Sequence, residues 1–265
     1  MTSTRPAWAS ASAFSDVLFS SALAAAWPCA ALAGDAEPIT PYRPSVSSPA
    51  QLPAAGQLEL ELGGLRLRSG TSRRDSLPVQ LKLAFSPEWG LLLGAEAQVA
   101  LRDGSAQASG FGDTSVVLKR AWAIDDATGA GIELGLKLPT ARDTIGSGKA
   151  DATLNAIYSQ DFGPVHMDAN LNATRLGAVD AGTGRVQAGA SASFSVPLSA
   201  QWGATAELSG TRRSGADSSA QWLGALTFSP SKRLSFDLGM ARAARPAPGA
   251  TSVFAGVVFP IATLW

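Results

Sequence analysis

The chain has one histidine, and it is the first residue to consider for catalysis. A hydrolase that uses a serine nucleophile needs that serine held against a histidine base, with another polar group to orient the histidine ring. The neighbours of His166 on its own strand face are Pro164 and Asp168, and only Ser159 on the preceding predicted strand could approach it. We therefore expect no catalytic residues and no enzyme, with His166 one polar residue among many.

Metal, cofactor and nucleic-acid chemistry find no support either. The chain has a single cysteine, Cys29, and no ligand spacing that suggests a zinc site. We expect no metal and no cofactor. The formal net charge is zero and no basic motif is present, so nucleic acid is not an expected partner.

Polar and apolar residues alternate along much of the chain, as in VHMDANLNAT at residues 165–174. Successive side chains of a strand point to opposite faces, so such a segment has one apolar and one polar face. In a membrane barrel the polar face lines the lumen. The residues predicted to line it are Glu59, Glu61, Lys82, Glu96, Asp113, Lys119, Glu133, Lys137, Asp151, His166, Asp168, Asn170, Asn172, Glu207 and Asp237.

These lumen residues mix acids and bases, and opposite charges on neighbouring strands can pair across the wall. A barrel of about twelve strands has room for a narrow wet pore or for a lumen filled by such pairs. The sequence leaves both interpretations open, a narrow and weakly selective channel or a closed barrel.

A second group of charges lies in the predicted long loops and at the adjoining strand ends. The residues expected at the outer mouth are Arg73, Arg74, Arg102, Arg142, Arg212 and Arg213. Arginine binds phosphate through two parallel hydrogen bonds, so these side chains could anchor a barrel to lipopolysaccharide or draw anions to the mouth. The alternative is ordinary solvated loop charges, several paired with aspartates such as Asp75 and Asp103.

The elements that would position these residues are short alternating strands. The candidates are 57–68, 77–85, 89–101, 113–124, 131–139, 150–160, 165–174, 185–198, 201–211, 220–228, 233–242 and 251–265. We expect Gly63-Gly64 to shift the alternation of the first strand, as a β-bulge would. The sequence predicts an all-β fold, a transmembrane antiparallel up-and-down β-barrel of about twelve strands over residues 57–265.

The connections support a membrane barrel over a soluble secreted sandwich. Short turns such as 86–88 and 161–164 alternate with longer segments such as 69–76, 102–112 and 140–149. Outer-membrane barrels have short periplasmic turns and longer outer loops. The last strand ends on Trp265, which resembles the signal that the barrel assembly machinery recognises in its clients, so that machinery is an expected partner.

Composition agrees with a chain that faces lipid. Charged residues make up 16% of the chain, against roughly 25% in a typical soluble domain. Beyond residue 33 no apolar run reaches the ~18 residues that a transmembrane helix needs. A membrane role would therefore have to be that of a barrel, placed in the bacterial outer membrane.

The N-terminus predicts export and a short lead-in. Residues 1–33 contain Arg5, an apolar run and the sequence Ala31-Leu32-Ala33, which together are typical of a cleaved signal peptide. Residues 34–56 are rich in proline and serine and have no period. They could form a periplasmic lead-in or fold back into the lumen as a plug, and no residue selects between the two.

A short set of motifs carries a family resemblance. The residues are Gly110-Phe111-Gly112-Asp113, Val116 to Lys119, Leu136 to Thr140, the loop DTIGSGKAD at 143–151, and Asn170 with Asn172. They resemble the outer-membrane transporter-like family named for the MetA-pathway of phenol degradation. The resemblance spans about residues 110–176 and implies an outer-membrane channel for aromatic or hydrophobic compounds, with no catalytic residues. The alanine-rich remainder departs from the family, so the substrate is not carried over.

The sequence thus predicts an outer-membrane β-barrel channel or transporter for passive uptake of small solutes, including aromatic or hydrophobic compounds. The expected partners are outer-membrane lipid and lipopolysaccharide, the assembly machinery and a small-molecule solute. The alternative is a closed structural or lipopolysaccharide-interacting barrel without transport activity.

Overall fold

The computed structural model describes residues 37–245 and 249–265. The predicted signal peptide, with Cys29, lies outside the described residues. No helix in the described part of the chain is long and apolar enough to cross a membrane.

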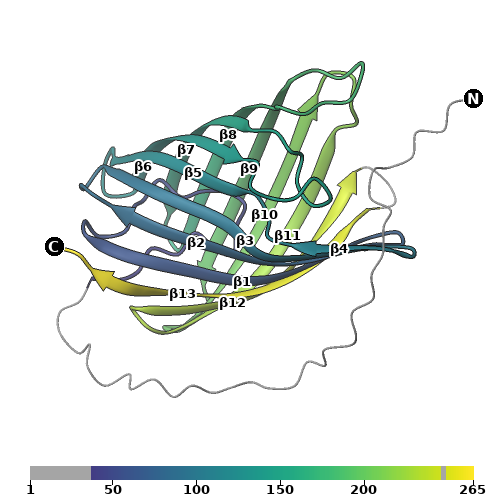
Figure 1. Cartoon of the computed structure of the whole chain (residues 1–265). Coiled ribbons are helices and arrows are strands. Elements are labelled where there is room, and N and C mark those ends of the chain that lie inside the picture. Colours follow the sequence, from purple (N-terminus) through teal and green to yellow (C-terminus); the bar gives the residue numbers. More distant parts are fainter. Residues whose placement is uncertain (1–36, 246–248) are drawn as a thin grey trace, which may run out of the picture.

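The described chain forms one antiparallel sheet that closes on itself (Figure 1). Its strands are β1 (Gln57–Ser69), β2 (Ser72–Ala84), β3 (Trp89–Asp103), β4 (Ala106–Gly110), β5 (Thr114–Ala123), β6 (Thr128–Leu138), β7 (Asp151–Phe162), β8 (Val165–Arg175), β9 (Val186–Pro197), β10 (Trp202–Arg213), β11 (Ser219–Ser231), β12 (Leu234–Arg245) and β13 (Thr251–Thr263). Each strand from β5 to β13 pairs with the next, β1 pairs with both β13 and β2, and the pairing of β2 with β3 closes the ring.

Strands β4 and β5 share one position in the wall. Strand β4 pairs with the loop-side half of β3, and β5 pairs with the other half. The thirteen strands therefore fill twelve positions, and the predicted barrel of about twelve strands is confirmed. Both ends of the barrel chain, Gln57 and Thr263, pair with each other at the end that carries the short turns.

Two predicted long loops are wrong. Residues 69–76 contain only a two-residue turn at Gly70 and Thr71, because β2 begins at Ser72. Residues 102–112 contain a hairpin instead, in which β3 turns at Gly104 into β4. Gly70 and Gly104 have φ angles of +58° and +57°, which glycine adopts without a Cβ clash, and this allows such tight turns.

The predicted phase shift at Gly63-Gly64 is also wrong. The register of β1 against β2 runs unbroken, with Leu62 opposite Val79 and Leu65 opposite Ser76. Leu65 consequently faces the lumen, where it packs on an apolar cluster of Leu223, Ala225, Ala241 and Phe254. The predicted bulge assumes that every inward position is polar, and the inward Leu65 does not meet that assumption.

A register shift does occur on the neighbouring strand pair. Between Ser76 and Pro78 of β2, the pairing with β3 slips by one residue. Val99 is therefore fully buried on the inner face, and Gln98 is exposed on the outer face, the reverse of the alternation predicted from the preceding residues. One extra residue in a strand inverts the facing of all residues beyond it.

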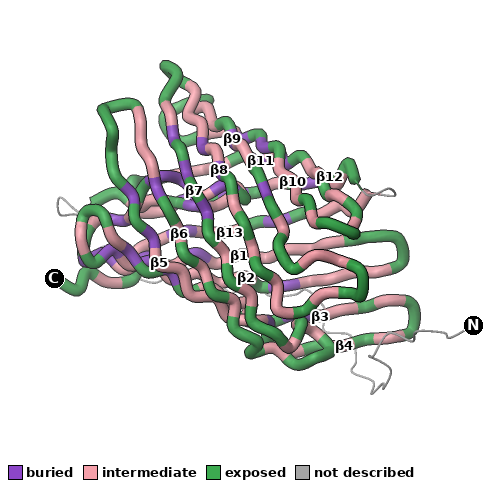
Figure 2. The backbone as a smooth tube through the Cα atoms, turned by 90° about the horizontal axis from the view of Figure 1, so that it is seen from above, coloured by how far each residue is buried: buried purple, intermediate pink, exposed green. Residues whose placement is uncertain are grey.

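The two faces of the wall have the polarity of a membrane barrel. Leu171, Leu208 and Leu238 are 68%, 67% and 65% exposed on the outside, whereas Glu59, Lys82 and Lys119 are 0% exposed inside. Figure 2 shows buried and exposed positions alternating along strands such as β7. Exposed aromatic side chains, among them Trp202 packed on Phe228 at 4.8 Å between ring centroids, lie near the short-turn end, as in an interfacial belt.

Leu171 tests the assignment of the outer face. It lies midway along β8, so Leu171→Arg places a charge in the hydrocarbon and should lower the free energy of unfolding in bilayers by about 2–4 kcal/mol. Its neighbour Asn172 faces the lumen, so Asn172→Arg is the control and should cost far less. Urea unfolding in lipid vesicles makes the comparison, and equal losses would contradict the assigned faces.

Candidate functional site

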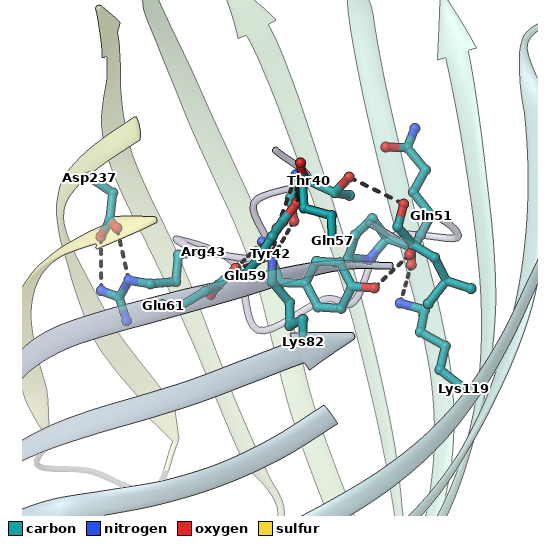
Figure 3. A network of polar contacts seen from close by, with 12 residues as sticks. Thr40, Tyr42, Arg43, Gln51, Gln57, Glu59, Glu61, Lys82, Lys119 and Asp237 are labelled. Atoms are coloured by element: carbon teal, nitrogen blue, oxygen red, sulfur yellow. Dashed lines mark hydrogen bonds and ion pairs between the residues drawn. The ribbon is translucent and has the colours of Figure 1, made fainter. Parts of the chain in front are cut away.

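Residues 37–56 lie inside the barrel and are called the luminal segment below. The Ile39 N–H donates to the Lys232 carbonyl at 2.9 Å, and the Gly56 N–H donates to the Ala84 carbonyl at 2.8 Å. Both contacts are at the short-turn end of the wall. Between them the segment rises into the lumen and returns, and Figure 3 shows its polar side chains meeting those of the wall.

The wall satisfies the backbone of the luminal segment with side chains instead of a strand ladder. Proline at five positions of the segment removes the N–H groups that a sheet would need. Carboxylates of the wall accept from several of the N–H groups that remain. The Thr40 N–H donates to Glu59 at 3.0 Å, the Tyr42 N–H to Glu61 at 2.8 Å and the Ser47 N–H to Glu207 at 2.9 Å.

The tip of the segment reaches the middle of the wall at Ser48. Its N–H donates to Asn170 Oδ1 at 2.8 Å, and its carbonyl accepts from Asn170 Nδ2 at 2.9 Å. The Ser48 hydroxyl donates to Glu133 at 2.6 Å, and Glu133 also accepts from Asn155 at 2.9 Å. Asn170 thus binds both backbone polar groups of Ser48, which fixes the height of the tip.

Two buried lysines flank the aromatic ring of Tyr42. The Nζ atoms of Lys82 and Lys119 lie 4.4 and 4.1 Å from its centroid, within the range of cation–π attraction. Lys82 pairs with Glu59 at 3.0 Å and with Glu61 at 2.6 Å.

Both lysines also bond to the segment backbone. Lys119 pairs with Glu133 at 3.1 Å and donates to the Pro49 carbonyl at 2.6 Å, and Lys82 donates to the Thr40 carbonyl. Charged groups that are buried away from water need such partners, because burying an unpaired ion costs several kcal/mol of folding free energy.

Among the described residues, Arg43 makes the one bidentate ion pair between the luminal segment and the wall. Its Nε and one terminal nitrogen donate to the two oxygens of Asp237 at 2.8 and 2.9 Å. The guanidinium lies against Gly63 and Gly256, which are register partners on β1 and β13. A Cβ on Gly63 would stand 2.6 Å from an Arg43 nitrogen, and one on Gly256 would stand 2.2 Å from another.

Two other inward glycines make room for the returning part of the segment. A Cβ on Gly90 would stand 2.6 Å from Leu52, and one on Gly129 would stand 3.2 Å from the Ala50 Cβ. With Gly63 and Gly256, four glycines thus line the contact with the segment. The inner surface of the wall is therefore complementary to the luminal segment in shape as well as in charge.

The residues predicted to line the lumen lie on the inner face, with the exception of Gln98. Those near the luminal segment are Glu59, Glu61, Lys82, Lys119, Glu133, His166, Asp168, Asn170, Glu207 and Asp237. Those nearer the loop end are Glu96, Asp113, Lys137, Asp151 and Asn172. In this second group Lys137 bridges Asp113 and Asp151 at 3.1 Å each, and Glu96 pairs with Arg74.

His166 is not paired with a serine. Its Nδ1 contacts Asp161 at 2.6 Å, and its Nε2 contacts Asp168 at 3.1 Å. Ser159 donates to Asp168 at 2.5 Å and accepts from the Ala50 N–H at 2.8 Å. Both ring nitrogens thus face carboxylates, and the arrangement lacks the contact between nucleophile and base that a hydrolase needs.

The predicted outer-mouth arginines divide between the two faces. Arg74 and Arg213 alternate with outward neighbours and lie on the inner face, whereas Arg73, Arg102 and Arg212 lie on the outer face near the loop end. Arg142 is exposed in the loop between β6 and β7.

Three cavities border the luminal segment. On the loop side one of about 610 Å³ is lined by Arg43, Arg74, Glu96, Asp113 and Lys137, and another of about 410 Å³ by mostly uncharged polar residues. On the short-turn side lies a cavity of about 260 Å³. The first and last share Tyr42, Arg43, Ser45 and Ser47 as lining, so the segment stands between them.

Sequence reasoning did not assign a role to any residue of the luminal segment or to the glycines opposite it. The signal was present in one respect, since Gly63 continues the inward positions of Glu59 and Glu61. An inward glycine in a row of charges indicates that something approaches the wall closely. Which segment approaches depends on contacts between residues as much as 194 positions apart.

Comparison with known proteins identifies the fold. No family model matches the sequence, and no curated protein matches it. The COG4313 outer membrane channel from Pseudomonas putida F1 superposes with a TM-score of 0.63 at 12% identity, over 80% of this chain and 98% of that one. The NanC porin superposes with a TM-score of 0.57 at 7% identity, over 76% and 100%. The CymD monoaromatic hydrocarbon channel reaches 0.50 at 9% identity, over 78% and 88%.

These proteins are outer-membrane channels and porins, and the chain has their fold. The likeness agrees with the apolar outer face and polar lumen, and the predicted outer-membrane location is confirmed.

Asp237→Asn tests how the luminal segment is held. The change removes the charge that pairs with Arg43, and a hydrogen bond to a charged group is worth about 1.5–3 kcal/mol. Ser47 is 1% exposed, so a thiol at Ser47→Cys should react slowly in the parent and about ten-fold faster with Asp237→Asn. The control is Asp75→Asn, which breaks an ion pair on the outer face. Equal thiol rates in all three proteins would exclude Arg43–Asp237 as a tether.

Proposed function

We propose that the protein is an outer-membrane channel for small solutes whose path is closed by the luminal segment and opens when that segment moves. One observation carries the proposal. Cavities of about 610 and 260 Å³ approach the segment from the two ends of the barrel and share its residues as their common lining. A barrel built only as a scaffold has no need of a displaceable segment between two cavities.

The contacts that hold the segment suit movement. Its backbone forms no strand with the wall, so no ladder of hydrogen bonds must be broken in register. Side chains such as Glu59, Glu207 and Asn170 hold it at separate points. After its departure Lys82 and Lys119 keep their carboxylate partners on the wall, so an open lumen leaves neither charge unpaired.

The lining favours uncharged polar solutes. The cavity of about 410 Å³ is bordered by amide and hydroxyl groups, with Glu133 and Arg245 as its charged residues. Its volume falls within the roughly 300–1,000 Å³ of small-molecule sites. Amides and hydroxyls both donate and accept, so they can replace the water lost by a hydroxylated solute. An apolar solute would leave them without partners.

Aromatic or hydrophobic solutes are the second candidate. They are supported by the apolar cluster of Leu65, Leu223, Ala225, Ala241 and Phe254 on the inner wall. The named solute of the CymD channel is a monoaromatic hydrocarbon, and that protein shares the fold. Membership of the family named for the MetA-pathway of phenol degradation would agree with this candidate, and it rests on the motifs between residues 110 and 176.

Other parts of the proposal follow from the sequence. Residues 1–33 are the export signal and are followed by the lead-in at 34–56, whose described part, 37–56, is the plug, and then by the barrel at 57–265. The C-terminal strand ending at Trp265 is the contact for the assembly machinery, and exposed outer arginines are contacts for lipopolysaccharide. The protein carries out no covalent chemistry.

Removal of the luminal segment tests the proposal. Deletion of residues 38–54 should convert the infrequent openings of the parent into stable conductance steps in planar bilayers, because the shared lining of the two cavities is gone. The deletion keeps β1 intact, and heat-dependent migration on a gel confirms the closed barrel in each preparation. A folded but silent deletion variant would favour the alternative of a closed structural barrel.

Asn172 tests the class of solute. It lines the cavity of about 410 Å³ next to Gly189, and Asn172→Leu removes an amide that a hydroxylated solute would contact. In vesicles that carry the deletion variant, we expect raffinose to enter several-fold more slowly after this change and toluene uptake to stay constant. Asn172→Gln keeps the amide and serves as the control. Slower toluene entry with unchanged raffinose entry would favour the hydrophobic candidate.

A further inference from the structure

Four of the outer arginines form a row on the outer face of the barrel, and the role assigned to them rests on the proposed contact of outer arginines with lipopolysaccharide. Arg242 of β12 and Arg68 of β1 both lie opposite Thr251 of β13. Arg68 lies opposite Arg73 of β2, and Arg73 lies opposite Arg102 of β3. We call Arg242, Arg68, Arg73 and Arg102 the arginine row.

The row faces outward, away from the lumen. Arg68 is exposed and continues the outward positions of β1, which alternate with the buried Glu59 and Glu61. Arg73 shares its face with Leu77, which is 50% exposed. On β12, Ala241 is 4% exposed and faces the lumen, so the adjacent Arg242 faces outward. All four side chains therefore border the lipid.

The row is at the loop end of the barrel. Arg68 is one residue from the end of β1, Arg73 is one residue from the start of β2, and Arg102 is one residue from the end of β3. The opposite end carries the short turns and both ends of the barrel chain. In an outer-membrane barrel the loop end meets the outer leaflet.

The protein neutralises only one member of the row, Arg73, and does so with a carboxylate that a further arginine shares. Arg66, beside it on β1, shares the single carboxylate of Asp75 with Arg73, at 2.6 and 2.5 Å. Among the described residues, Arg68, Arg102 and Arg242 have no ion pair. Like charges directly opposite on neighbouring strands destabilise a sheet. Two such contacts in succession, Arg68 to Arg73 and Arg73 to Arg102, call for an anion outside the chain.

We propose that the arginine row binds the phosphate groups of the glycolipid in the outer leaflet, the bisphosphorylated lipid A part of lipopolysaccharide. The planar guanidinium matches a phosphate with two parallel hydrogen bonds, and several guanidinium groups in line match a headgroup with more than one phosphate. The adjoining outer surface provides the apolar contact for acyl chains, with Leu77 below the row. This site is independent of whether the lumen conducts.

Binding of purified lipids to the full chain in detergent micelles tests the site by native mass spectrometry. The row variant is Arg73→Gln/Arg102→Gln. The matched control is Arg175→Gln/Arg212→Gln, which removes two exposed arginines from the same edge and face, opposite alanine or valine on their paired strands. We expect at least ten-fold weaker lipid A binding by the row variant and less than two-fold by the control. Equal losses in the two variants would overturn the site.

The probe lipids separate the possible sources of phosphate. Lipid A should bind more tightly than its monophosphorylated form, and the dephosphorylated form should not distinguish the row variant from the parent. Displacement of lipid A by millimolar inorganic phosphate would assign the row to soluble anions. Equal binding of phosphatidylglycerol would assign it to anionic lipid in general, and either result would overturn the proposal.

Arg102→Gln gives a readout that a structural role would not produce. The change removes one repulsive contact, so in phosphatidylcholine vesicles the variant should resist urea slightly better than the parent. In vesicles that contain lipopolysaccharide it should resist urea less well, because a ligand contact is lost. A change in urea resistance of the same sign in both kinds of vesicle would contradict the proposal.

Discussion

The constraint on which the lumen depends is the satisfaction of charges that the wall holds away from water. Glu59, Glu61, Lys82, Lys119 and Glu207 are all at most 4% exposed in the half of the barrel nearest the short turns. Such charges require partners in good geometry. The luminal segment provides backbone N–H groups for the acids and carbonyls for the lysines. The wall charges therefore fix the position of the luminal segment, and the segment in turn supplies their partners. The cavities on its two sides are the parts of the lumen that the segment does not fill.

The alternation of polarity made the architecture predictable from the sequence. It located the twelve positions of the wall and put the predicted charged lumen residues on the inner face, whereas Gln98 faces outward. The failures have local causes. Leu65 and Val99 face the lumen because one inner patch is apolar and because one strand pair slips by a residue. Glycine turns at Gly70 and Gly104 replaced predicted loops, since neighbouring strands there pair up to the turn.

The site was less predictable than the fold because its main contacts have no local signature. Residues 37–56 show no period, so neither strand nor helix could be assigned, and their position depends on wall side chains distant in sequence. Arg43 reaches Asp237 only after β12 and β1 have been brought together through β13. The arginine row is similar, since Arg68, Arg73 and Arg102 become neighbours only once the strand register is known.

A reversible staple between segment and wall would test the central claim, that displacement of the luminal segment opens the barrel. The hydroxyl oxygens of Ser47 and Ser191 are 2.9 Å apart, so Ser47→Cys/Ser191→Cys can form a disulfide in a chain without Cys29. The measurement is bilayer conductance of this protein before and after addition of a reductant. Our account predicts a silent barrel when oxidised and conductance steps after reduction. Equal conductance in the two states would contradict it.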